Sequence, residues 1–234
     1  MSSKYKRIML KLSGEVLAGE KGFGIDYGTV EAVCSVIAAC VREGVQIGIV
    51  VGGGNFWRGR QNGEMERTRA DNVGMLATVM NSIVLNDSLA LLGVDAVVMS
   101  ALEMPKFAEY FTRDKAVAYL DAGKVVIFAC GTGNPFFSTD SAAALRGAEI
   151  GAEVYFKATN VDGVYDKDPN KFADAVKYDA LTHDEVLAKN LGVMDATAAA
   201  LCRDNALAVL VFNLTQPENI LKAVTGERVG TLIQ

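Results

Sequence analysis

Six stretches of the chain are apolar almost throughout, without alternation between hydrophobic and polar positions. They cover residues 7–14, 45–51, 94–100, 124–133, 153–159 and 207–212. A strand that is covered on one face alternates, whereas a strand that is buried on both faces is continuously apolar. We therefore expect six strands of a mainly parallel sheet that carries helices on both of its faces.

Hydrophobic residues between these stretches recur at the spacing of an α-helix. The clearest set is Val30, Val33, Ile37 and Val41. Further helices are expected over residues 71–92, near 112–122, over 140–151, and from residues 195 and 217. Strands that alternate with helices are typical of an α/β domain. Because no linker or repeat interrupts the pattern, we expect one domain over residues 1–234, built as a three-layer αβα sandwich.

Four residues mark the expected starts of these helices. An aspartate side chain accepts hydrogen bonds from the free N–H groups of a first helical turn. We therefore expect Asp71, Asp140 and Asp195 to begin their helices. Pro217 fits the first position of the last helix, because proline has no N–H group to satisfy there.

Small and polar residues gather where the apolar stretches end. The segments KLSG, GGGN, GTGN and KATN each lie at such an end. In a parallel sheet these ends share one edge, where backbone N–H groups and helix N-termini favour anions. Three successive glycines, Gly52–Gly54, are costly to order, so we expect a group that approaches this backbone closely. The sequence indicates that the group is phosphate.

Two basic side chains lie beside these loops. Lys11 is near the end of the first apolar stretch, and Arg58 follows the glycines. Phosphoryl transfer requires two anions held in line and positive charge over the transferred group, which the two residues together favour. Taken singly, Lys11 is as well explained by a lysine that reaches water from a strand end, and Arg58 by a solvated loop arginine. The chain contains no Walker A loop, and no GxGxxG fingerprint follows a strand.

Composition restricts the partners. The chain has a net charge of -5 and no long block of like charge, so we expect neither nucleic acid nor a membrane as partner. The N-terminus is polar, and no signal peptide is expected. Residues 75–92 come nearest to a membrane span, but Asn81, Asn86 and Asp87 interrupt them.

The cysteines indicate the cellular compartment, and the single histidine restricts the possible mechanisms. The 4 cysteines form no CxxC pair, and each lies in an apolar stretch. We expect buried, reduced thiols and a cytoplasmic protein. Thr182 and Glu185 have the spacing of a capping box, which would place His183 on an exposed helix surface. The mechanism is therefore not expected to depend on this histidine.

Five segments together resemble the bacterial uridylate kinases of the amino acid kinase superfamily. They are KLSGE (11–15), GGGNFWRG (52–59), DNVGMLATVMN (71–81), TGNPFFSTDSAA (132–143) and VDGVYDKDP (161–169). The resemblance runs from about residue 4 to residue 233, and GGGNFWRG, MLATVMN and TGNPFFSTD are its most particular parts. It implies the amino acid kinase (carbamate kinase-like) fold. It also implies transfer of the γ-phosphate of ATP to UMP, giving UDP for pyrimidine nucleotide biosynthesis.

The resemblance assigns roles to individual residues. Lys11, Arg58 and Asp140 would be catalytic, with Lys11 stabilising charge and Asp140 orienting this lysine or the metal. The residues implied for ATP are Lys11, Leu12, Ser13, Gly14, Gly54, Arg58, Thr159, Asn160, Tyr165 and Asp168. The residues implied for UMP are Gly53, Asp71, Thr132, Gly133, Asn134, Pro135, Phe136, Phe137, Ser138 and Thr139. Lys157 is a further candidate for charge stabilisation, and Mg²⁺ would come with ATP, held mainly by phosphate oxygens and water.

Regulation and assembly are implied as well. GTP would activate, UTP would inhibit, and the chain would form a homohexamer. The segment implied for GTP is Gly19, Glu20, Lys21, Gly22, Phe23 and Gly24, for which an ordinary flexible surface loop remains an open alternative.

Two other functions stay open at this point. One is a superfamily kinase that phosphorylates an acyl or carbamoyl group, which TGNPFFSTD and Arg58 disfavour. The other is a non-catalytic nucleotide-binding regulator, which the presence of both Lys11 and Asp140 disfavours.

Overall fold

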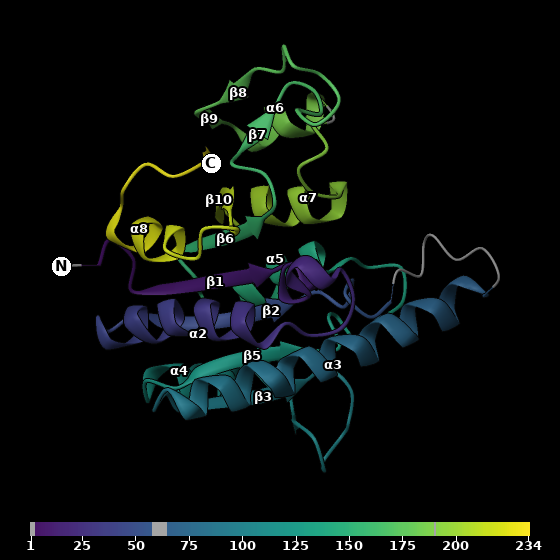
Figure 1. The fold of residues 1–234 in the computed structure, drawn as a ribbon, viewed down its shortest axis with the longest axis vertical. Helices are drawn as coiled ribbons and strands as arrows, with labels where there is room; N and C mark the ends of the chain where they lie inside the picture. Colours follow the sequence, from purple (N-terminus) through teal and green to yellow (C-terminus); the bar gives the residue numbers. More distant parts are fainter. Residues whose placement is uncertain (1–2, 58–64, 190) are drawn as a thin grey trace.

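The computed structural model describes residues 3–57, 65–189 and 191–234. Its main strands are β1 (Arg7–Leu12), β2 (Gln46–Val51), β3 (Ala96–Ser100), β4 (Glu109–Tyr110), β5 (Val125–Ala129), β6 (Val154–Thr159), β9 (Ala180–Leu181), β10 (Ala208–Asn213) and β11 (Thr231–Ile233). Over the described residues they form a nine-stranded sheet in the order β4-β3-β5-β2-β1-β6-β10-β11-β9 (Figure 1). Neighbours in it run parallel except β10 and β11. The expected mainly parallel sheet is confirmed.

Helices cover both faces of this sheet. The helices are α1 (Gly14–Leu17), the 3₁₀ helix η1 (Gly19–Lys21), α2 (Tyr27–Arg42), α3 (Arg67–Leu91), α4 (Arg113–Asp121), α5 (Thr139–Glu149), α6 (His183–Ala188), α7 (Ala196–Asp204) and α8 (Asn219–Thr225). One hydrophobic core joins the sheet to α2, α3 and α8. A second core joins the opposite face to α4, α5, α6 and α7. The three layers are those of the expected αβα sandwich.

Strand β1 explains why the predicted strands are continuously apolar. Ile8, Leu10 and Leu12 point into the core beneath α2, α3 and α8, whereas Met9 points into the core on the other face. All four side chains are fully buried. Alternate residues of a strand face opposite sides of its sheet, so a strand between two helical layers needs apolar residues at both sets of positions.

Two of the aspartates predicted to begin helices do not do so. Helix α3 begins at Arg67, capped by the side chain of Glu66, and Asp71 therefore lies inside the helix. Helix α5 is capped by Ser138, whose hydroxyl accepts from the N–H groups of Asp140 and Ser141. In both cases a competing cap lies one or more residues earlier, which leaves the aspartate carboxylate for other contacts.

The C-terminal part of the chain holds two further differences and one agreement. Helix α8 begins at Asn219 and not at Pro217. The capping box at Thr182 is present as predicted. His183, however, is only 5% exposed, because the first turn of α6 turns this side chain towards the interior. Asp195 caps α7 as predicted, accepting from the N–H of Ala198 at 3.0 Å.

Several short elements had no detectable pattern in the sequence. The strands β4 and β9 have two residues each and β11 has three. A separate hairpin joins β7 (Val164–Tyr165) and β8 (Lys177–Tyr178). Runs of two or three residues are too short to show periodicity. The hairpin lies near β6 and β10, away from α3 (Figure 1).

Helix α3 has 25 residues and is largely apolar. Among the described residues it is the one helix long and apolar enough to cross a membrane. In the structure it lies along the sheet, with Leu85 and Leu89 fully buried in the core it shares with α2. The core helix of a packed domain has the same composition, and α3 is placed as such a helix.

Candidate active site

The four polar loops lie at the carboxyl ends of β5, β2, β1 and β6, which are consecutive strands of the sheet. The chain places β2 on one side of β1 and β6 on the other, so the strand order reverses at β1. Open α/β sheets bind ligands in the crevice at such a reversal. The prediction that these loops meet at one edge is confirmed.

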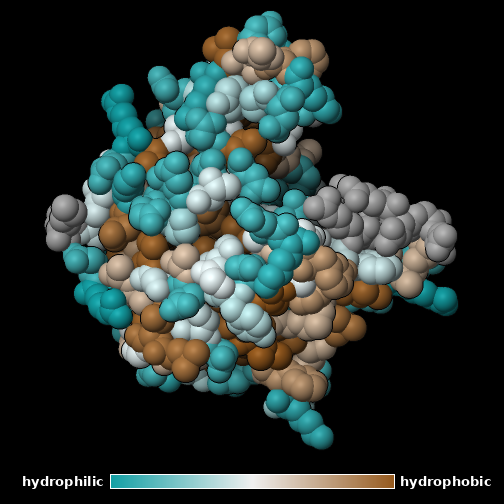
Figure 2. All heavy atoms as spheres, viewed as in Figure 1, coloured by the Kyte–Doolittle hydropathy of each residue, from teal (hydrophilic) through white to brown (hydrophobic). Residues whose placement is uncertain are grey.

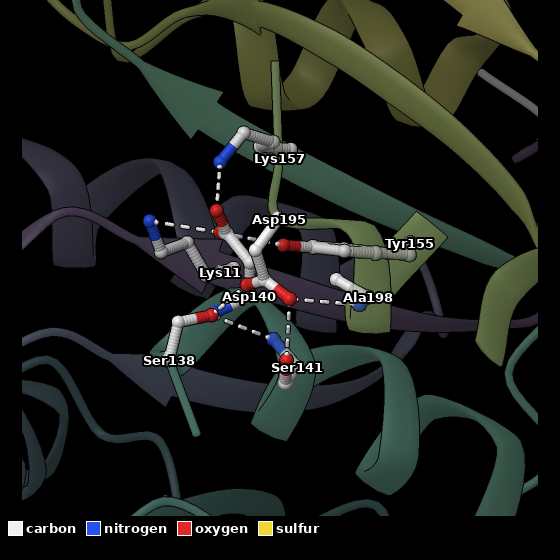
Figure 3. A network of polar contacts seen from close by, with 8 residues as sticks. All are labelled: Lys11, Ser138, Asp140, Ser141, Tyr155, Lys157, Asp195 and Ala198. Atoms are coloured by element: carbon white, nitrogen blue, oxygen red, sulfur yellow. Dashed lines mark hydrogen bonds and ion pairs between the residues drawn. The ribbon is translucent and has the colours of Figure 1, made fainter. Parts of the chain in front are cut away.

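Two lysines and one carboxylate form the centre of this edge (Figure 3). Lys11 on β1 and Lys157 on β6 are register partners, so their side chains leave the sheet next to each other. Between them lies Asp140, in the first turn of α5. Its carboxylate is 3.1 Å from Lys11 Nζ and 2.6 Å from Lys157 Nζ. The Tyr155 hydroxyl donates to the same carboxylate at 3.0 Å.

This cluster is largely buried, and both of its lysines contact the same carboxylate. Lys11 is 9% exposed and Lys157 is 6% exposed. Burial raises the pKa of Asp140, but the charges of Lys11 and Lys157 outweigh burial and hold this pKa well below its ordinary value. Burial and the charge of Lys11 lower the pKa of Lys157 to about 8, against the opposing effect of Asp140. Two ammonium groups thus contact one carboxylate directly, while the carboxylate of Asp195 acts on Lys157 through its charge.

A first hollow, of about 170 Å³, opens between α3 and the loops that follow β2 and β5. Among the residues predicted for UMP, it is lined by Gly53, Asp71, Thr132, Asn134, Phe137, Ser138 and Thr139. Its lining also includes Trp57, Gly74, Met75, Thr78 and Cys130, which were not predicted. Residues 71, 74, 75 and 78 lie on one face of a helix, so helical spacing from Asp71 was the signal for three of them.

Other residues predicted for UMP lie outside this lining. Gly133, Pro135 and Phe136 do not line the first hollow. Phe136 is 63% exposed, with the guanidinium of Arg67 5.3 Å from its ring centre. Its backbone N–H donates to Asp71 Oδ2 at 2.8 Å, so this loop is tied to α3 at the mouth of the hollow.

Polar residues of α3 hold the two loops that border the first hollow. Asn81 is fully buried and donates to the carbonyl of Gly52 at 2.7 Å and to Asn55 Oδ1 at 2.7 Å. Thr78 Oγ1 accepts from the N–H of Cys130 at 2.9 Å. The polar residues that interrupt this otherwise apolar helix therefore fix the loops after β2 and β5.

Gly53, in the glycine loop after β2, is packed against α3 with no room for a side chain. A Cβ at Gly53 would lie 2.8 Å from Ala77 Cβ and 2.8 Å from the carbonyl oxygen of Gly74. A Cβ at Gly14 would lie 2.4 Å from the carbonyl oxygen of Gly52. Close approach of one chain segment to another is thus one reason for glycine at these positions, in addition to the expected approach of a phosphate.

A second and larger hollow, of about 480 Å³, lies on the β6 side of the cluster. The predicted residues Thr159, Tyr165 and Asp168 line it, together with Asp140 and Lys157. The lining also includes Lys167, Pro169 and the segment 192–195, which were not predicted. Ser138 lines both hollows and so forms their common border, whereas the cluster residues Asp140 and Lys157 line the second hollow.

The remaining predicted ATP residues lie in several places. Leu12 has a fully buried side chain, so only its backbone is available at the edge. Ser13 and Gly14 begin α1 at the end of β1, and Gly54 lies in the loop after β2. Asn160 lines a different hollow, beside α1 and α2. Arg58 lies outside the described residues.

The segment predicted for GTP, residues 19–24, forms η1 and the turn after it. Gly22 and Gly24 have positive φ angles of 68° and 74°, which glycine adopts without strain. The N–H of Gly24 donates to the carbonyl of Asn55 at 3.0 Å, and Phe23 packs edge-on against Phe56. The segment is therefore attached to the glycine loop.

Comparisons with known proteins agree with this arrangement. Residues 6–213 match the amino acid kinase family. The structure is similar to UMP kinase from Bacillus anthracis, with a TM-score of 0.95 and 37% identity over 98% of this chain and 96% of that chain. It is also similar to UMP kinase from Ureaplasma parvum, with a TM-score of 0.92 and 36% identity over 99% of both chains. Uridylate kinase from Archaeoglobus fulgidus gives a TM-score of 0.74 and 30% identity over 97% of this chain and 99% of that chain. The protein belongs to the amino acid kinase family and, within it, to the UMP kinases.

Proposed function

We propose that this protein transfers the γ-phosphate of ATP to UMP, giving ADP and UDP. The observation that carries the proposal is the Lys11–Asp140–Lys157 cluster. Asp140 and Lys157 line the second hollow, and Ser138, which lies two residues before Asp140, lines both hollows. The three similar structures named above are UMP or uridylate kinases. These similarities favour a nucleotide acceptor over an acyl or carbamoyl acceptor, and an enzyme over a regulator without turnover.

In this proposal ATP occupies the second hollow and UMP the first. Lys11 and Lys157 stabilise the charge that spreads over the oxygens of the phosphoryl group in the transition state. Asp140 orients both ammonium groups, since each lies within 3.1 Å of its carboxylate. Little covalent chemistry is required of the protein, so rigid positioning and fixed charge supply most of the rate enhancement.

Mg²⁺ fits this site as an ion that arrives with ATP. Within the described ranges, no cluster of three or more His, Cys, Asp or Glu side chains is positioned to hold a metal ion. The carboxylate of Asp140 already accepts from Lys11, Lys157 and Tyr155. Phosphate oxygens and water are therefore the expected ligands, and the ion would supply positive charge next to the phosphates of ATP.

The acceptor specificity provides the first test. A pocket that hydrogen-bonds the N3–H and O4 of uracil leaves its own groups mispaired when cytosine enters, and such mispairing rejects an analogue strongly. Asn134 and Thr132 line the first hollow and supply suitable amide and hydroxyl groups. In a coupled assay of ADP release, we expect kcat/KM for UMP to exceed that for CMP by at least ~1,000-fold.

The same assay with dTMP and acetylglutamate separates the alternatives. Turnover of acetylglutamate without turnover of UMP would contradict the proposed function. Comparable kcat/KM values for UMP and CMP would instead contradict only the uracil-reading role of residues 132–139.

The proposal includes a homohexamer in the cytoplasm that GTP activates and UTP inhibits. Support for self-association comes from α3, where Leu76, Met80 and Ile83 form an apolar stripe that is 50%, 46% and 40% exposed. Hydrophobic residues gather over the lower part of the molecule, where α3 lies (Figure 2). Residues 19–24 are attached to the glycine loop, so GTP bound at this segment could change the position of the loop beside the first hollow. GTP and UTP added to the same assay test the two regulatory roles.

A further inference from the structure

Asp195 makes contacts beyond those of an ordinary helix cap. Its Oδ1 accepts from the N–H of Ala198, which caps α7, and from the hydroxyl of Ser141 at 2.9 Å. Its Oδ2 accepts from the hydroxyl of Ser138 (Figure 3). A cap requires one carboxylate oxygen, whereas this side chain uses both, and two of its three partners belong to the start of α5.

The partners of Asp195 lead directly to the lysine-carboxylate cluster. Ser138 Oγ accepts from the N–H groups of Asp140 and Ser141, both at 3.1 Å, and so fixes the first turn of α5. Asp140 lies in that turn and holds Lys11 and Lys157. The chain of contacts therefore runs from Asp195 through Ser138 to the backbone of Asp140.

Asp195 also belongs to the wall of the second hollow, and Ser138 lines both hollows. A hydrogen bond from a hydroxyl to a carboxylate is stronger than one between neutral groups. The contact between Asp195 and Ser138 thus joins the 192–195 wall to the loop that borders the first hollow.

We propose that Asp195 is a positioning residue for phosphoryl transfer, which holds the first turn of α5 so that the Asp140 carboxylate stays between Lys11 and Lys157. The proposal rests on the function proposed above. It predicts that loss of the Asp195 carboxylate lowers kcat more than it raises KM, because misplaced charge is felt most in the transition state.

Asp195 also acts on the cluster through its charge. Lys157 faces Lys11 from β1, Asp140 from α5 and Asp195 from the segment before α7. Burial and Lys11 lower the pKa of Lys157 to about 8, while Asp140 and Asp195 oppose that shift. If the protonated ammonium is the active form, kcat falls as the pH rises through about 8. Removing the Asp195 charge moves this fall to lower pH.

Asp195→Asn is the informative substitution, because asparagine caps a helix as well as aspartate does. We expect its melting temperature to stay close to that of the wild type. We expect kcat to fall at least ~10-fold, with KM for ATP and UMP changed less than ~3-fold. Asp204→Asn is the matched control, since Asp204 lies at the other end of α7, contacts Arg203 and is exposed. It should leave kcat and its pH dependence unchanged.

A readout in the ligand-free protein separates this inference from the proposed function. Lysine labelled with ¹³C at Cε reports the pKa of Lys157 by NMR, with the signal assigned by its loss in Lys157→Arg. We expect the pKa of Lys157 to be lower in Asp195→Asn than in the wild type. A wild type that fails to phosphorylate UMP would contradict the proposed function, and the NMR titration would still test Asp195. An Asp195→Asn variant with unchanged kcat and an unchanged Lys157 titration would overturn the inference, as would a lower melting temperature with unchanged kcat.

Discussion

At the scale of single residues, the proposed chemistry depends on the two lysines that contact Asp140. One carboxylate faces two buried ammonium groups, Lys11 and Lys157, and the surroundings exclude most water. In such a place fixed charges act more strongly than they do in solvent. In the proposed function both ammonium groups stabilise the phosphoryl group, and each lysine is therefore expected to contribute to the rate.

Lys11→Ala tests this expectation. The substitution removes a charge that matters more in the transition state than in the ground state, so kcat should fall by at least ~100-fold, about 3 kcal/mol. Steady-state kinetics with UMP and ATP measure the effect. Lys6→Ala is the control, because Lys6 lies just before the same strand and its side chain is exposed. Near-normal kcat in Lys11→Ala would remove this lysine from the mechanism.

Residue types at strand ends were predictable from the sequence, but their partners were not. Lys11 stood out because a charged residue near the end of an apolar stretch is unusual. Lys157 carried the same signal on β6, yet only the pairing of β1 with β6 shows that the two lysines are neighbours. The sequence indicated only a capping role for Asp195. Its contacts with Ser138 and Ser141 could not be predicted, because they depend on how α7 packs on α5.

At the scale of elements, α3 holds the loops that border the first hollow. Its inward polar residues hold the loops after β2 and β5, while its apolar residues pack on the sheet. The sequence predicted this helix but placed its start at Asp71, whereas it begins at Arg67. Helix ends depend on which of several competing side chains caps the first turn, and that competition is decided by local geometry that periodicity does not report.

Asn81→Ala tests the role of α3 as a support for the glycine loop. The substitution leaves the carbonyl of Gly52 and the side chain of Asn55 without their buried partner, and each unsatisfied group costs about 1–3 kcal/mol. We expect a lower free energy of unfolding in urea and a higher KM for UMP, because the loop loses its fixed position.

Asn86→Ala is the matched control on the same helix. The Oδ1 of Asn86 is buried and has no hydrogen-bond partner among the described residues. Its removal should therefore cost less stability than removal of Asn81 and leave KM unchanged. Equal effects of the two substitutions would mean that α3 does not act through the loop.

At the scale of the whole molecule, the order of the strands creates the site. The reversal at β1 brings four polar loops together between two helical layers, where two hollows share Ser138 as their border. The parallel sheet and the shared edge followed from the apolar stretches. The antiparallel strand β11, the hairpin of β7 and β8 and the 192–195 wall did not, because short segments are fixed by the tertiary packing around them.

The outer face of α3 is expected to form an interface between subunits. Leu76, Met80 and Ile83 are spaced by four and three residues, so they form one stripe on a helix whose opposite side is buried in the core. A contiguous apolar patch on the surface of a domain marks a site of association.

Ile83→Lys places a charge in the stripe, and burying an unpaired charge in an interface is unfavourable. We expect light scattering after size-exclusion chromatography to show a smaller assembly than in the wild type, with unchanged secondary structure by circular dichroism. Val176→Lys is the control, because Val176 is 61% exposed and precedes β8 at the far end of the molecule. A wild type that is already monomeric would contradict the proposed hexamer, and an Ile83→Lys variant that assembles as the wild type does would show that the α3 stripe is not the interface.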